Sequence, residues 1–190
     1  MRESHWDYRD IVIHHAGRSY SCGAPSIQEI RRAQREDMSR AEPFDDIGYH
    51  YAVSCQGEIY EGRDIRYIGE HISVGNTGKV GIVLLADLVE AGEAYEQEYK
   101  SMTLGRRIRA LPQIFVDRAV VKHDEPTESQ MKALRVLSEV LKEFFNIIYL
   151  GGHREYQMLT NGKGRACPGN RGMAIVKSLR SELGFSAPSK

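Results

Sequence analysis

Short runs of aliphatic residues alternate along this chain with segments whose apolar residues recur every three or four positions. The runs at residues 11–13, 80–85 and 147–150 are typical of buried strands, because they are short and end at polar residues or glycine. Helices are expected from Ser26 to about Asp37, after Thr127, and from Met173 to Leu183. Strands interleaved with helices predict an α/β fold in which helices pack on a single mixed central sheet.

Local signals refine this outline. Ser26 with Glu29, and Thr127 with Gln130, have the spacing of helix capping boxes. Residues 49–54 and 58–61 flank a Gln-Gly pair and predict a β-hairpin. One apolar stripe is expected on the helix after Thr127, formed by Met131, Leu134, Leu137, Leu141 and Phe144.

The length of 190 residues suits a single domain, residues 1–190, with one long insertion. The 39 residues from Leu88 to Pro126 are more than an ordinary loop needs. Spacing predicts a helix around residues 91–102 and an extra strand at 114–121. We favour a decorative insertion over a lid or a docking surface for a protein partner. Its ends, Asp87 and Thr127, are expected to lie close together, so a short linker should replace it.

Charge and composition exclude several classes of protein. Lys and Arg (26) balance Asp and Glu (26), which argues against a nucleic-acid binder and against a polybasic membrane anchor. No apolar run reaches the ~18–20 residues of a membrane span. The polar start of the sequence predicts a protein that is cytoplasmic as synthesised and acts on a cell wall after lysis or specialised export. Three widely spaced cysteines predict no disulfide framework, and Cys22 and Cys55 receive no functional role.

Three residues have the chemistry of a metal-ligand set. His14 ends the first predicted strand, His153 follows a Gly-Gly turn, and Cys167 lies in a loop before the last helix. Two histidines and one cysteine leave the fourth position of tetrahedral zinc open, as in catalytic sites. Taken singly, such a histidine is more often an ordinary hydrogen-bonded residue, and such a cysteine is more often part of the core.

Six short motifs that occur in a fixed order support the metal-site interpretation, because together they resemble a known family. They are IVIHH at 11–15, DIGYHY at 46–51, GEH at 69–71, GNTGKVGI at 75–82, GH at 152–153 and RACPG at 165–169. The series resembles the zinc amidases of the type-2 N-acetylmuramoyl-L-alanine amidase family, which includes phage lysozyme-amidases and peptidoglycan recognition proteins. The resemblance covers about residues 10–183 apart from the insertion, and it implies an amidase/peptidoglycan-recognition-protein-like fold.

The resemblance implies that His14, His153 and Cys167 bind Zn²⁺. Tyr49 matches the family's catalytic tyrosine. Arg165 stands where phage-type members carry a catalytic lysine, and it keeps the positive charge without being able to transfer a proton. Both side chains would donate hydrogen bonds to the oxyanion that forms when an amide carbonyl is attacked.

Four further side chains receive weaker interpretations. His71 matches a family histidine at the cleft and is assigned to substrate contact, with a hydrogen-bonded loop histidine as the alternative. Lys163 is a second candidate cation. His15 and His50 are interpreted as supporting or packing residues.

The resulting hypothesis is zinc-dependent hydrolysis of the amide bond between N-acetylmuramic acid and L-alanine. The substrate would be peptidoglycan or muropeptides. The alternative is a non-catalytic peptidoglycan-binding module of the same fold. The presence of Cys167 favours the enzyme, because non-catalytic relatives typically lack this ligand. A structural zinc site is disfavoured, because no fourth ligand is evident nearby.

Overall fold

A five-stranded sheet forms the centre of the protein in the computed structural model, which describes residues 1–17, 22, 25–119 and 123–189. Its strands lie in the order β3-β2-β4-β1-β5. β1 pairs in parallel with β4 and β5, β2 pairs in parallel with β4, and β3 runs antiparallel to β2. The predicted mixed sheet is therefore confirmed. The strand bounds are Asp10–His15 (β1), Tyr51–Val53 (β2), Ile59–Glu61 (β3), Lys79–Leu84 (β4) and Tyr149–Gly152 (β5).

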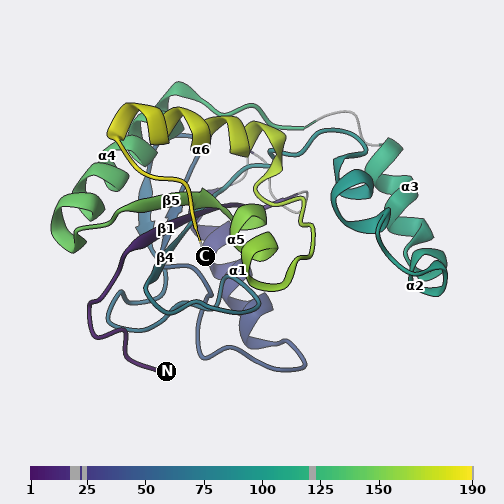
Figure 1. Ribbon diagram of the computed structural model, residues 1–190, viewed down its shortest axis with the longest axis horizontal. Helices are drawn as coiled ribbons and strands as arrows, with labels where there is room; N and C mark the ends of the chain where they lie inside the picture. Colours follow the sequence, from purple (N-terminus) through teal and green to yellow (C-terminus); the bar gives the residue numbers. More distant parts are fainter. Residues whose placement is uncertain (18–21, 23–24, 120–122, 190) are drawn as a thin grey trace.

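Helices cover both faces of the sheet (Figure 1). α4 (Glu128–Phe145) and α6 (Gly169–Leu183) pack on one face and contribute to the main hydrophobic core. α1 (Ser26–Met38) and α5 (His153–Asn161) contribute to two smaller apolar clusters. This arrangement is the expected α/β sandwich.

Side chains alternate along β1, and this alternation decides on which face of the sheet the candidate ligand His14 lies. Ile11 and Ile13 belong to the main core, whereas Val12 packs with Tyr156 of α5. Successive side chains of a strand point to opposite faces, so His14 shares the α5 face with Val12. The strand therefore directs His14 away from the main core.

The insertion consists of helices that stand apart from the sheet in Figure 1. They are a short π-helix, η1 (Tyr95–Tyr99), followed by α2 (Leu104–Arg109) and α3 (Leu111–Ala119). The ends of the insertion lie together, as expected: the backbone N–H of Asp124 donates to the carbonyl oxygen of Asp87 at 2.9 Å. Leu88 is fully buried in the main core, so the insertion leaves the core after this residue and not before it.

The predicted strand at 114–121 is wrong. Residues 111–119 form α3, and the N–H of Ile114 donates to the carbonyl oxygen of Ala110 at 2.9 Å, as in a helix. A short apolar run does not by itself distinguish a strand from a helix, which explains the error. Residues 120 and 121 lie outside the described part of the chain.

Two details of the predicted helices are also corrected. Ser26 does not cap α1, because its hydroxyl donates to Glu58 and Pro25 occupies the capping position. Phe144 is 73% exposed, while its neighbour Phe145 packs edge-on against Tyr8. Thr127 does cap α4, accepting a hydrogen bond from the N–H of Gln130 at 3.1 Å.

The expectation of no disulfide is wrong for one pair of cysteines. Cys22 and Cys55 form a disulfide with a Cα–Cα distance of 5.3 Å, across 33 positions of sequence. The bond joins the segment before α1 to the turn between β2 and β3. Cys167 is a free cysteine. No helix in the described residues is long and apolar enough to cross a membrane.

Candidate metal centre and cleft

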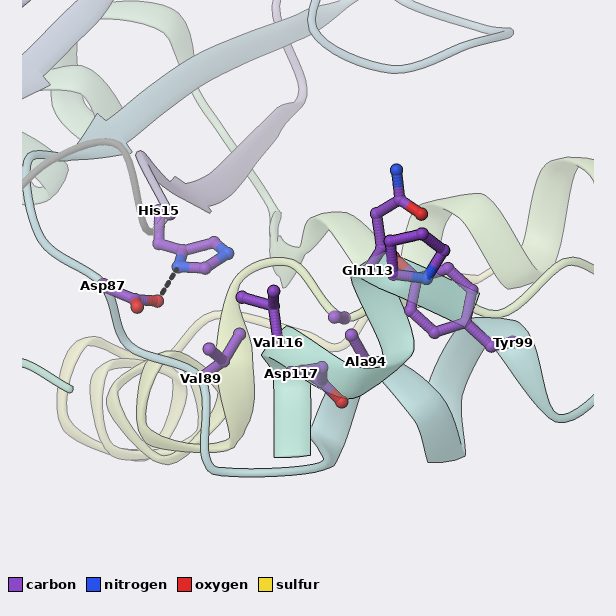
Figure 2. A pocket seen from close by; sticks show the side chains of 11 residues that line it. His15, Asp87, Val89, Ala94, Tyr99, Gln113, Val116 and Asp117 are labelled. Atoms are coloured by element: carbon purple, nitrogen blue, oxygen red, sulfur yellow. Dashed lines mark ion pairs between the residues drawn. The ribbon is translucent and has the colours of Figure 1, made fainter. Parts of the chain in front are cut away.

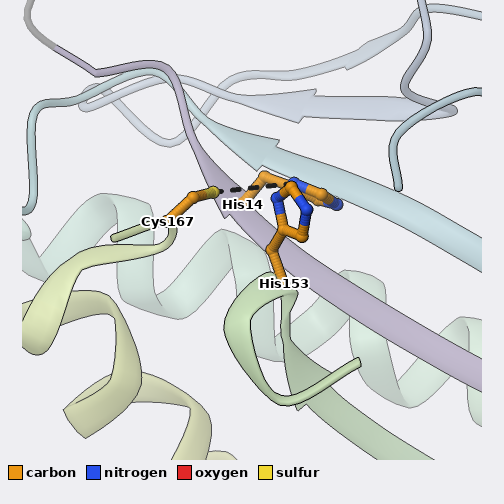
Figure 3. A group of neighbouring side chains, drawn as sticks. All are labelled: His14, His153 and Cys167. Carbon is orange, nitrogen blue, oxygen red and sulfur yellow. Dashed lines mark hydrogen bonds between the residues drawn. The ribbon is translucent and has the colours of Figure 1, made fainter. Parts of the chain in front are cut away.

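Three elements bring the predicted ligands together. His14 lies near the end of β1, His153 is the first residue of α5, and Cys167 lies in the loop before α6. One candidate ligand atom of each residue lies within 4.8 Å of the others, and the three side chains converge in Figure 3. The Sγ atom of Cys167 is 3.6 Å from Nδ1 of His14. The segment between His153 and Cys167 contains α5 and places the two ligands side by side.

Burial keeps both histidines neutral, as a metal requires. It lowers the pKa of His14 well below the usual range. It also lowers the pKa of His153 to about 4, with the positive charge of Arg165 acting in the same direction. Burial raises the pKa of the Cys167 thiol to about 12. The buried Nε2 atom of His153 has no hydrogen-bond partner among the described residues. This donor set fits zinc, whose binding would deprotonate the thiol.

A second histidine layer lies behind the ligands. Nε2 of His14 is 3.1 Å from Nδ1 of His71, and this contact leaves Nδ1 of His14 facing Cys167. His71 fits because residue 81 is glycine: a Cβ atom there would lie 2.4 Å from the ring of His71. A hydrogen bond to the second ring nitrogen fixes the orientation of a metal-binding histidine. The structure therefore adds a contact with His14 to the predicted substrate role of His71.

His15 and His50 are engaged elsewhere. Nδ1 of His50 accepts a hydrogen bond from the N–H of Gly81 at 3.0 Å, and its Nε2 lies 3.0 Å from the carbonyl oxygen of Tyr67. Nδ1 of His15 accepts from the N–H of Leu88 at 3.2 Å. Both residues support the structure around the ligands, in agreement with their predicted roles.

A cleft of about 730 Å³ opens beside the ligand group. Tyr49, His71, His153 and Arg165 contribute to its lining, so it joins the predicted catalytic residues to the metal ligands. The Tyr49 ring stands edge-on to His14, with centroids 4.9 Å apart. The Arg165 side chain is about half exposed. The predicted site residues thus meet at one cleft.

The insertion forms another part of the cleft wall. Residues 101–103 and Arg106 contribute to its lining. Oε1 of Glu98 accepts a hydrogen bond from the backbone N–H of Ala166 at 2.7 Å, and Oε2 accepts one from Arg165 at 3.5 Å. The insertion therefore holds the loop that carries Arg165 and Cys167.

A second contact anchors the insertion on both sides of the ligand loop. Glu93 pairs with Arg154, the residue after the ligand His153. Its Oε2 atom also accepts a hydrogen bond from the N–H of Asn170 in α6 at 2.9 Å. Arg154 in turn donates its backbone N–H to the carbonyl oxygen of Cys167 at 3.0 Å. A decorative insertion would not make these contacts, and no sequence motif pointed to either glutamate.

A separate pocket of about 440 Å³ lies between the insertion and the end of β1 (Figure 2). Asp87 stands 3.7 Å from His15 at its inner end, and Val89 and Val116 contribute apolar surface. None of the three candidate ligands lines this pocket. We therefore place the candidate functional site at the cleft with Tyr49 and Arg165.

Comparison with known proteins places this site in a family. The sequence profile of the family described as N-acetylmuramoyl-L-alanine amidase matches residues 6–170, most of the chain. The chain belongs to this family. The family's members include catalytic amidases and non-catalytic binding proteins, and many of them depend on zinc.

One relative of this amidase-family chain is a peptidoglycan-recognition protein. Peptidoglycan-recognition protein SD of Drosophila simulans is 33% identical over 79 residues, which are 42% of this chain and 42% of that protein. The match thus spans less than half the length of that relative.

The solved structures that share the fold include an amidase and a recognition protein. One is the N-acetylmuramoyl-L-alanine amidase LysC from Clostridium intestinale, with a TM-score of 0.59 and 22% identity, covering 98% of this chain and 92% of that one. The other is peptidoglycan recognition protein-LE in complex with tracheal cytotoxin, with a TM-score of 0.61 and 20% identity, covering 95% and 83%. At these identities the likeness establishes the fold of the amidase-family chain.

Proposed function

We propose that this protein is a zinc-dependent N-acetylmuramoyl-L-alanine amidase. The substrate would be peptidoglycan or its muropeptide fragments, and the bond broken would join the lactyl group of N-acetylmuramic acid to L-alanine. The observation that carries the proposal is the complete set of His14, His153 and Cys167 at a cleft that also contains Tyr49 and Arg165. Zinc bound by these ligands would supply a Lewis acid and water activated at neutral pH.

The chain's own residues would bind and orient the amide. The Tyr49 hydroxyl and the Arg165 guanidinium, which both line the cleft, would donate hydrogen bonds to the carbonyl oxygen as it gains negative charge. Glu98 would hold Arg165 and the Cys167 loop in place before the substrate arrives. His71 would fix the ring of His14, and its position in the lining also supports the proposed contact with substrate.

The size and the charged lining of the cleft are consistent with a muropeptide as the ligand. Arg106 and Lys163 line it together with Arg165, and these cations suit the free carboxylates of a stem peptide. The related recognition protein-LE was solved with tracheal cytotoxin, a monomeric diaminopimelic acid-type peptidoglycan. A non-catalytic peptidoglycan-binding module is the alternative function, because recognition proteins are among the relatives.

We further propose that the protein acts outside the reducing cytoplasm, after lysis or specialised export. The Cys22–Cys55 disulfide supports this location, because disulfides persist mainly in oxidising compartments.

Mass spectrometry of purified muropeptides after incubation with the protein tests the function. We expect release of stem peptides with a free L-alanine amino terminus, intact glycan, and loss of activity with a chelator or in Cys167→Ser. New reducing sugar ends, or cleavage within the stem peptide, would refute the amidase. Binding of muropeptides without cleavage by the zinc-loaded protein would favour the binding module.

A further inference from the structure

The two α-helices of the insertion expose an unusual number of apolar side chains. Leu104 and Ile108 of α2 are 72% and 57% exposed, and Leu111 and Phe115 of α3 are 55% and 76% exposed. Each pair is four residues apart, so its members lie on one side of their own helix. In Figure 1, α2 and α3 stand at the edge of the molecule, away from α4 and β5. We call residues 101–119 the insertion lobe.

The insertion lobe is also strongly basic. It contains four arginines, at positions 106, 107, 109 and 118, and a single acidic residue, Asp117. Asp117 is fully buried and accepts a hydrogen bond from the N–H of Tyr95 at 3.1 Å. The exposed charge of the lobe is therefore positive, although positive and negative residues balance over the whole chain. The overall balance hides this local separation of charge.

Exposed Leu, Ile and Phe side chains beside several arginines are the composition of helices that lie in a membrane interface. The apolar side chains of such helices enter the acyl boundary, while the arginines stay with the anionic headgroups. We propose that the insertion lobe binds the surface of a membrane rich in anionic phospholipids. The positive charge of the lobe complements the negative charge of such a membrane. The position of the lobe at the edge of the molecule leaves it accessible to a flat surface.

The insertion lobe also forms part of the cleft wall. Met102, Thr103 and Arg106 belong to the lobe and also line the cleft beside Arg165. Arg106 lies two residues from both Leu104 and Ile108, on the other side of α2, so these two side chains can meet a membrane while Arg106 stays in the cleft. The surface contact itself does not depend on amidase activity, so the two proposals are tested separately.

Co-sedimentation of the full chain with vesicles tests the proposal. We expect binding to vesicles of phosphatidylglycerol and phosphatidylcholine, little binding to phosphatidylcholine alone, and weaker binding at 0.5 M salt, roughly as screening predicts. Ile108→Ser combined with Phe115→Ser should lower the partition constant at least about fivefold, through lost apolar burial. Arg109→Gln should weaken binding to the anionic vesicles and leave the little binding to neutral vesicles unchanged.

Phe144→Ser is the matched control, because Phe144 is 73% exposed on α4, away from the lobe. This variant should bind vesicles like the wild type. Circular dichroism must show that every variant is folded. The proposal is overturned by absence of binding to anionic vesicles, by equal binding to neutral vesicles, or by an equal loss in Phe144→Ser. A wild-type dimer that Ile108→Ser with Phe115→Ser converts to a monomer would also overturn it, since a second copy would then cover the lobe.

Discussion

Glu98, in the insertion, accepts a hydrogen bond from the backbone N–H of Ala166, the residue that separates Arg165 from Cys167. The contact spans 68 positions of sequence and ties the insertion to the loop that carries a metal ligand. The insertion backbone approaches this loop so closely that a Cβ atom at Gly164 would overlap the carbonyl oxygen of Gln97. The insertion is thus part of the site and not an addition to it.

Removing the Glu98 carboxylate should therefore slow the reaction without removing the metal. In Glu98→Ala, the loop loses a charge-assisted hydrogen bond and Arg165 loses its ion pair, so we expect kcat to fall on the order of 10- to 100-fold. Glu98→Gln keeps an acceptor for Ala166 and should fall less. Steady-state kinetics and zinc content measure both effects.

Glu96→Gln is the control for this prediction. Glu96 lies in the same helix and pairs with the exposed Lys100, away from the ligand loop. Its replacement should leave kcat unchanged. Equal kcat values for Glu98→Ala and the wild type would show that Glu98 has no positioning role.

Replacing the Tyr49 hydroxyl tests the proposed hydrogen-bond donors. Tyr49→Phe should lower turnover roughly 10²–10³-fold while keeping zinc, because one donor to the developing oxyanion is lost. Arg165→Ala should act in the same way, and Arg165→Lys should retain part of the activity because the charge remains. If Tyr49→Phe is fully active, then Tyr49 is only a packing aromatic beside His14.

Zinc binding should release about one proton near pH 7. Burial raises the pKa of Cys167 to about 12, so its thiol is protonated in the metal-free protein. Burial lowers the pKa of His153 to about 4, so this ring already lacks the extra proton. Zinc affinity should then rise about tenfold per pH unit from pH 5 to 8, since one proton competes with the metal.

Calorimetry in buffers of different ionisation enthalpy counts these protons. His153→Ala should greatly weaken the binding. Release of two or more protons at pH 7 would contradict the neutral state of the histidines, and release of none would contradict a thiolate ligand.

Reduction of the Cys22–Cys55 disulfide should destabilise the protein by about 2–4 kcal/mol, the usual effect of such a cross-link. Urea unfolding with and without a reductant measures the difference. A variant with Cys22→Ser and Cys55→Ser should show no effect of the reductant. Three free thiols in the unfolded, unreduced protein would disprove the bond.

Sequence patterns were sufficient to predict the mixed sheet and to select His14, His153 and Cys167, which the structure brings together. Each depends on local regularities: short apolar runs for the sheet, and a fixed order of motifs for the three residues. Phe144 and Phe145 show the limit of such patterns, because adjacent aromatic residues fit a helical stripe almost equally well.

Such local patterns could not predict contacts between segments that lie far apart in the sequence. The pairing of Glu98 with the ligand loop joins residues with no shared periodicity, and a Cys22–Cys55 pairing cannot be deduced from spacing alone. The charge of the insertion lobe was hidden for a different reason. It becomes visible only when the structure shows that Asp117 is buried and the neighbouring arginines are not counterbalanced within the lobe.

We propose that one zinc ion at His14, His153 and Cys167 makes this protein an amidase. The most direct test is the turnover of a purified muropeptide by metal-stripped protein as zinc is added back. We predict no cleavage without metal and full activity at about one zinc per chain, with no recovery in His153→Ala. Cleavage by the metal-free protein at the rate of the zinc-loaded wild type would contradict zinc-dependent catalysis at this site.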